Sequence, residues 1–226
     1  TYSTINACKN FGAEIKDVGN DITVNSTGEL KLHSNTIDAA NSGTTIRIAT
    51  AISTLSSDKI VLTGDSSLKK RPMQPLLDAL ESLDAKCSSS NGNPPISISG
   101  KIKGGEVKIS GSVSSQFISA LMITAPKLEK GLILNIQNKL VSKPYIDATI
   151  AAMKKFGAEV KIKTAYKKYI IDKQDYKSTT FAIPSDFSSL ALLLSAAVLL
   201  GEDITIQISS GSMPQADEAI IDILEI

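Results

Sequence analysis

The chain has 226 residues, of which 42% are hydrophobic and 4% aromatic, so its core must be built mainly from aliphatic side chains. A chain of this length can form one large domain or two smaller ones. Its 24 Lys and Arg residues are balanced by 23 Asp and Glu, so no overall positive field favours a nucleic-acid partner.

Two cysteines and one histidine further restrict the chemistry. Cys8 and Cys87 are too few for a disulfide framework and are not spaced as a metal motif, which indicates a reduced, intracellular chain. His33 lies beside Ser34 and Asn35 in a polar stretch, where we expect a surface residue. These counts argue against a zinc site and against a histidine-dependent triad.

Two interleaved series of helical segments recur along the chain. The first series occupies 5–15, 76–87, 149–160 and 219–226, and its turn residues Gly12, Asp84 and Gly157 are 72 and 73 residues apart. The second series occupies 41–53, 111–124 and 185–200. Each of its helices begins with a pair of hydroxyl residues, and successive pairs are 70 and 74 residues apart. Two series with nearly the same period predict a repeated structural unit.

Short strands are predicted between these helices, and several of them alternate polar with apolar residues. They fall at 22–24, 59–62, 96–98, 107–109, 132–136, 160–162, 169–171 and 204–206. Each unit therefore has two helices and about four strands, an α/β fold. The most hydrophobic stretch, 190–200, is too short to span a bilayer, which needs about 20 apolar residues, and we expect it to be a helix buried between sheets.

The polar stretch 173–180 is predicted to connect two domains. We place most of one three-unit domain, without its first segment, at 1–182 and the truncated start of a second domain at 183–226. Neither end of the chain resembles a natural terminus, since Thr1 falls in the middle of an expected element and Ile226 within the apolar run at 219–224. We therefore expect a fragment that is inactive by itself.

Serine residues precede two of the helical segments, in GSVSSQF (111–117) and LVSKPYI (140–146). The first N–H groups of a helix have no internal partner and carry partial positive charge, so hydroxyls placed there can hold a phosphate. Alternatively, each serine only caps its helix.

Four segments resemble the signature sequences of the 5-enolpyruvylshikimate-3-phosphate synthase family: NSGTTIR (41–47), LTGDSSLKKRP (62–72), GSVSSQF and LVSKPYI. They occur in the family's order and at about its spacing. The resemblance implies inside-out α/β barrel domains of repeated βαβαββ units, with helices inside and mixed sheets outside. It also implies transfer of the enolpyruvyl group of phosphoenolpyruvate to the 5-hydroxyl of shikimate 3-phosphate, with release of phosphate.

The resemblance assigns substrate-binding roles to seven residues. The 3-phosphate of shikimate 3-phosphate is expected on Ser114, Ser115 and Ser142, with the shikimate moiety against Tyr145. Gln116 is expected between the two substrates. Phosphoenolpyruvate is expected at Gly43, where a Cβ would intrude, and at Arg71, whose planar fork suits an oxyanion. For Arg47, a ligand role and a role in tying down a neighbouring loop remain open.

The family uses no metal or organic cofactor, acts in aromatic amino-acid biosynthesis and implies a cytoplasmic enzyme, a monomer at full length, with no nucleic-acid or membrane partner. The acid and base residues are expected outside this chain, because Asp65, Asp147 and Asp186 match no family motif for those roles. Three other functions remain open: a non-catalytic phospholigand-binding module, an enolpyruvyl transferase of the UDP-N-acetylglucosamine type, and an RNA 3′-phosphate cyclase.

Overall fold

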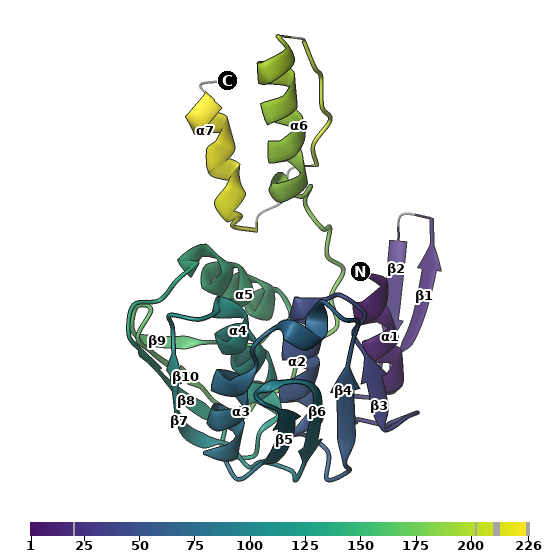
Figure 1. The fold of residues 1–226 in the computed structure, drawn as a ribbon, viewed down its shortest axis with the longest axis vertical. Helices are drawn as coiled ribbons and strands as arrows, with labels where there is room; N and C mark the ends of the chain where they lie inside the picture. The colour runs from purple at the N-terminus through teal and green to yellow at the C-terminus, as the bar shows by residue number, and fades with distance from the viewer. Residues whose placement is uncertain (20, 202, 210–212, 225–226) are drawn as a thin grey trace.

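The fold repeats one arrangement of helices and strands, as seen in a computed structural model that describes residues 1–19, 21–201, 203–209 and 213–224. The chain opens with one helix and an antiparallel hairpin, the same order of elements that closes each later unit. These elements are α1 (Tyr2–Asn10), β1 (Glu14–Val18) and β2 (Asp21–Asn25). The hairpin extends from the body of the molecule (Figure 1).

Two complete units follow, each with the order βαβαββ. The first comprises β3 (Thr36–Asp38), α2 (Gly43–Ser53), β4 (Ile60–Thr63), α3 (Gln74–Glu81), β5 (Lys86–Ser90) and β6 (Asn93–Ser99), with a 3₁₀ turn, η1 (Leu68–Lys70), before α3. The second comprises β7 (Gly105–Ser110), α4 (Ser115–Thr124), β8 (Leu132–Gln137), α5 (Lys143–Lys155), β9 (Lys161–Thr164) and β10 (Lys168–Ile171), with η2 (Ala125–Lys127) after α4. The predicted repeat of two helices and four strands is confirmed.

The two units build their sheets in the same way. Strand orders are β3-β4-β6-β5 and β7-β8-β10-β9. In each sheet the first two strands are parallel and the remaining pairs antiparallel. The expected mixed sheets are therefore present, as two open four-stranded sheets in the described part of the chain.

Helices fill the space between these sheets. Helix α2 packs on α4, and α3 contacts both β5 of its own unit and β7 of the next. Their apolar faces are fully buried, as at Ile46, Leu76 and Phe117. Facing them, β8 buries every second residue, as a strand with one face on the core must. The expected placement of helices inside and sheets outside is confirmed.

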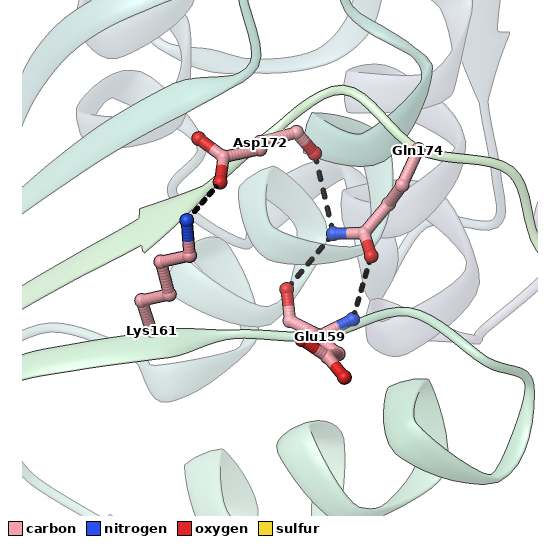
Figure 2. Close-up of polar contacts among 4 residues, drawn as sticks. All are labelled: Glu159, Lys161, Asp172 and Gln174. Atoms are coloured by element: carbon pink, nitrogen blue, oxygen red, sulfur yellow. Dashed lines mark hydrogen bonds and ion pairs between the residues drawn. The ribbon is translucent and has the colours of Figure 1, made fainter.

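The segment after β10 is fastened to the body of the molecule. The Gln174 side chain forms two hydrogen bonds with the backbone of Glu159: it accepts from the N–H at 2.8 Å and donates to the carbonyl at 2.9 Å (Figure 2). Next to it, Lys161 forms an ion pair with Asp172 at 2.5 Å (Figure 2). Further along, the Tyr176 hydroxyl donates to the Ile123 carbonyl at 2.8 Å. The predicted connection at 173–180 thus has no regular secondary structure but runs along the domain surface for its first half.

The remaining elements stand apart from the sheets (Figure 1). They are α6 (Phe187–Leu200), η3 (Ala216–Ala219) and α7 (Ile220–Leu224). The predicted helix at 185–200 is confirmed, but the expectation that it is buried is wrong: Leu192 is 75% exposed and Leu199 85%. An apolar helix is buried only where a partner covers it, and within the described residues α6 packs chiefly on η3.

Three smaller predictions have clear outcomes. The strand predicted at 204–206 is wrong, since 203–209 carry no regular secondary structure. His33 is exposed, as expected, and Cys8 and Cys87 are both free thiols. None of the helices described has the length and apolar character needed to cross a membrane.

Candidate functional site

A hollow of about 250 Å³ lies where α4 and α5 begin. We call it the serine cavity. Its lining includes the three serines expected to hold the 3-phosphate and the two residues expected beside it, Gln116 and Tyr145. The complete lining is Val113, Ser114, Ser115, Gln116, Val141, Ser142 and Tyr145. The resemblance assigns Ser114, Ser115 and Ser142 to one phosphate, and the structure brings these three serines to one cavity although they come from two separate segments.

The sheet explains this convergence. Strands β7 and β8 are parallel neighbours, so the helices that follow them start at the same edge of the sheet. Two backbone bonds join the loops there: Gly111 N–H donates to Gln137 O at 2.8 Å, and Val141 N–H donates to Gly111 O at 3.0 Å. A Cβ on Gly111 would lie 2.8 Å from Ile136 Cγ2, so the loops can approach this closely only with glycine at that position.

The three serines differ in how their hydroxyls are used. Ser114 is the N-cap of α4, and its Oγ accepts from the Gln116 N–H at 3.3 Å. Ser115 follows in the first turn and is buried. Ser142 is the N-cap of α5 but has left-handed backbone angles (φ 55°, ψ 49°), and its side chain makes no cap bond. The capping interpretation therefore accounts for Ser114 but not for Ser142, which lines the cavity without a cap bond.

Two arginines meet in front of Gly43, the first residue of α2. A Cβ built on this buried glycine would lie 2.7 Å from Arg71 Nη1 and 3.6 Å from Arg47 Nη1. Arg71 follows η1, and Arg47 lies one helical turn after Gly43 on α2. We call Arg47 and Arg71 the arginine pair. Glycine at this position leaves the space that the two guanidinium groups occupy.

The arginine pair carries uncompensated positive charge. Neither arginine forms an ion pair with a carboxylate within the described residues, and Arg47 Nε is buried there without a hydrogen-bond partner. Burial lowers the pKa of the Arg47 guanidinium, and the positive charge of Arg71 lowers it further. Arg47 is half-buried and Arg71 exposed, and partial burial of a cation without a counter-charge is unfavourable. An oxyanion placed between the two groups would relieve that cost.

One hydrogen bond joins the two parts of the site. Arg47 Nη1 donates to Gln116 Oε1, and the Arg47 guanidinium also lies 5.0 Å above the Phe117 ring. Gln116 lines the serine cavity, so the cavity and the arginine pair form one continuous polar site across α2 and α4. The sequence reading left the role of Arg47 open. The signal for a ligand role was its four-residue spacing from Gly43, which puts Arg47 and Gly43 on one face of a helix.

The three aspartates considered for acid–base work all have structural bonds. Asp65 Oδ1 accepts from the Leu68 N–H at 2.7 Å. Asp147 accepts from the Tyr166 hydroxyl at 2.8 Å. Asp186 caps α6 and accepts from Ser188 and Ser189. None of them lines the serine cavity.

Repeated βαβαββ units with helices packed against mixed sheets place the chain in a class of α/β repeat proteins. The family model for "EPSP synthase (3-phosphoshikimate 1-carboxyvinyltransferase)" matches residues 1–226. The chain therefore belongs to the EPSP synthase family.

Named relatives agree with this assignment. The chain is 56% identical over 225 residues to the 3-phosphoshikimate 1-carboxyvinyltransferase of Nitrosopumilus maritimus, covering 100% of this chain and 53% of the relative. It is 47% identical to the protein of the same name from Methanosarcina mazei, covering 100% and 54%. A solved EPSP synthase from Acinetobacter baumannii superposes with a TM-score of 0.73 at 26% identity, covering 87% of this chain and 44% of that one. The chain thus spans about half the length of the curated relatives it matches.

Proposed function

We propose that the protein transfers the enolpyruvyl group of phosphoenolpyruvate to the 5-hydroxyl of shikimate 3-phosphate and releases phosphate. The observation that carries this proposal is the bond between Arg47 and Gln116. This bond joins a cavity lined with hydroxyls to two arginines that form no ion pair within the described residues, so that two anionic substrates could lie next to each other.

Shikimate 3-phosphate is assigned to the serine cavity. Ser114, Ser115 and Ser142 would donate to the 3-phosphate, supported by the positive ends of α4 and α5. Tyr145, which is 48% exposed at the cavity wall, would contact the shikimate ring. Neutral donors suit a phosphate monoester on a polyol because they can bind both its oxygens and nearby hydroxyls.

Phosphoenolpyruvate is assigned to the arginine pair. Guanidinium groups bind carboxylate and phosphate oxygens in a bidentate manner, and Gly43 keeps the approach to them open. Gln116 would then lie between the two substrates, as its bond to Arg47 already spans the two regions. Holding the enol carbon near the 5-hydroxyl supplies the proximity that a two-substrate transfer requires.

Addition of a proton to the methylene carbon and removal of one from the hydroxyl need positioned acid and base groups. We assign these groups to the part of the relatives' length that this chain does not span. In the same proposal, 1–182 form most of one domain and 183–226 begin a second. The attachment of Tyr176 to the Ile123 carbonyl supports a boundary beyond that residue. The enzyme would act in the cytoplasm as a monomer.

The test is phosphate release from phosphoenolpyruvate in the presence of shikimate 3-phosphate, measured with the full natural protein. Release that depends on both substrates is expected. Titration of each substrate by calorimetry then separates the alternatives. Binding of shikimate 3-phosphate without turnover would favour a non-catalytic phospholigand-binding module. Turnover with UDP-N-acetylglucosamine in place of shikimate 3-phosphate would contradict the substrate assignment.

A further inference from the structure

Helix α5 contributes Ser142 and Tyr145 to the serine cavity, yet apolar burial holds it only weakly. Of its residues only Ile146 and Met153 are buried, whereas α4, on the other side of the cavity, buries eight. The position of α5 therefore depends more on polar contacts than that of α4. Because a cavity keeps its shape only if both walls are fixed, the contacts that locate α5 also determine the geometry of the cavity.

A relay of two hydroxyls connects α4 to the backbone of Tyr145. Ser119 Oγ lies 2.7 Å from Thr149 Oγ1, and the Thr149 hydroxyl donates to the Tyr145 carbonyl at 2.7 Å. A carbonyl can only accept, so Thr149 uses its one proton there and must accept from Ser119. The relay runs from Ser119 through Thr149 to Tyr145, a residue of the cavity wall.

The repeat contains a second hydroxyl bond of this kind. Thr4 and Thr149 both lie eight residues before the turn glycines of their repeats, Gly12 and Gly157, and Thr4 Oγ1 lies 2.8 Å from Thr45 Oγ1 on α2. The equivalent residue of α3 is Leu76, which is fully buried, and α3 packs on strands β5 and β7. Hydroxyl bonds between helices thus occur beside α2 and α4, the two helices whose starts build the site.

We propose that Ser119 and Thr149 are positioning residues, whose relay holds the first turn of α5 so that Ser142 and Tyr145 face Ser114 and Ser115 at the spacing a sugar-like phosphate ester requires. The identity of that ligand as shikimate 3-phosphate rests on the proposed function. The position of the first turn of α5 does not rest on the proposed function, and amide hydrogen exchange measures it separately. Neither residue lines the cavity, so an effect on binding must act through Tyr145 and Ser142.

The test uses four variants of the full natural protein. Thr149→Val and Ser119→Ala remove the relay, and Thr149→Ser keeps its hydroxyl as a rescue variant. Thr124→Val is the matched control, because Thr124 is buried on the same helix as Ser119 but bonds only within its own helix, to Ala120 O at 2.9 Å. The first readout is amide hydrogen exchange at Tyr145 and Ile146. The second is KM for each substrate.

Loss of the relay should speed exchange at these two amides and raise KM for shikimate 3-phosphate about fivefold to tenfold, the effect of about one neutral hydrogen bond. KM for phosphoenolpyruvate should stay within about twofold. Thr149→Ser should restore both readouts, and Thr124→Val should move neither.

Unchanged exchange at Tyr145 would overturn the inference, as would equal rises in both KM values or the same rise in Thr124→Val. If the unsubstituted protein shows no transfer, the proposed function fails, and the exchange data still decide whether the relay holds α5.

Discussion

The two complete units of this molecule share a topology but contribute different chemistry to the site. In each, the first helix begins at the carboxyl end of a parallel strand pair. The start of α2 supplies Gly43, with Arg47 one turn later, while the start of α4 supplies Ser114 and Ser115. Under the proposed assignment, topology determines where an anion binds, and the side chains that each unit places there determine which kind of anion.

The chemical difference follows from the donors. Serine hydroxyls and helix N–H groups are neutral or dipolar, so they suit a ligand that also presents hydroxyls. Guanidinium groups carry full charge and form the stronger, charge-assisted bonds. If the assignment is correct, substitutions in the first unit should affect phosphoenolpyruvate selectively, and substitutions in the second should affect shikimate 3-phosphate selectively.

The largest selective effect is expected for Arg71→Ala in the first unit. Removing one guanidinium from the arginine pair should weaken phosphoenolpyruvate binding about a hundredfold, since a charge-assisted bond contributes about 1.5–3 kcal/mol. Shikimate 3-phosphate binding should change by less than about threefold. Calorimetric titration of each substrate measures both values. Lys70→Ala, at the neighbouring exposed position, is the control, and equal losses for both substrates would show that Arg71 is structural.

The reciprocal effect is expected for Ser142→Ala in the second unit. Its hydroxyl makes no cap bond, so its loss should leave α5 intact and cost one ligand contact. Shikimate 3-phosphate binding should fall about tenfold to thirtyfold, as for one hydrogen bond to a charged acceptor. The same titration should show little change for phosphoenolpyruvate. Ser112→Ala is the control, because Ser112 belongs to the other serine segment, GSVSSQF, but lies outside the cavity lining. If Ser112→Ala weakens shikimate 3-phosphate binding more than Ser142→Ala does, the placement of Ser142 in the site is wrong.

Much of this comparison could be predicted from the sequence because it depends on local signals. The helix starts, the repeat period and most strands of both units follow from periodicity and turn residues that act over a few positions. Strands β3 and β5 were not among the predicted strands. The convergence of Ser115 and Ser142 also follows, because parallel neighbouring strands bring successive helix starts to one edge.

Long-range contacts were not predictable in this way. The apolar pattern of 190–200 predicts a helix but cannot say whether a partner covers it, and in the described structure Leu199 remains exposed. The bond between Arg47 and Gln116 joins residues 69 positions apart, and no local pattern encodes it. The relay from Ser119 to Thr149 was missed for the same reason: a serine and a threonine inside two helices carry no signal of their pairing.

A smaller effect is expected for Gly43→Ala, which tests whether the arginine pair needs the glycine. The added Cβ would lie 2.7 Å from Arg71 Nη1, and because this is the end of a flexible side chain it can shift away. We therefore expect KM for phosphoenolpyruvate to rise about fivefold, corresponding to about 1 kcal/mol, with the melting temperature nearly unchanged. Gly111→Ala is the comparison in the second unit, since its Cβ would meet Ile136 Cγ2 at 2.8 Å and Leu140 Cα at 3.0 Å. Gly111→Ala should lose stability. A lower melting temperature in Gly43→Ala, with none in Gly111→Ala, would contradict the assignment.

The smallest expected effect is a dependence of stability on pH, which should come from the hairpin of the second unit and not from that of the first. In the first unit, Met73 N–H donates to the hairpin residue Gly92 O at 2.8 Å beside the start of α3, and this backbone bond does not titrate. In the second unit, the hairpin residue Tyr166 donates its hydroxyl to Asp147 on α5 at 2.8 Å, and Lys143 Nζ lies 4.9 Å above its ring. The hydrogen bond to Asp147 raises the pKa of Tyr166, and burial and the charge of Asp147 raise it further.

A raised pKa means that the fold favours the protonated phenol. The contribution of this contact to stability is therefore complete below the ordinary tyrosine pKa of about 10 and is lost as the pH rises through the higher folded value. Subtracting the tyrosinate absorbance titration of Tyr166→Phe from that of the unsubstituted protein isolates this residue, and its midpoint should lie above the ordinary value. Asp147→Asn should bring the midpoint down, because it removes the charge that opposes ionisation. A midpoint at or below the ordinary value, or one insensitive to Asp147→Asn, would show that this hairpin is not held to α5 through Tyr166, and the proposed difference between the two units at this position would disappear.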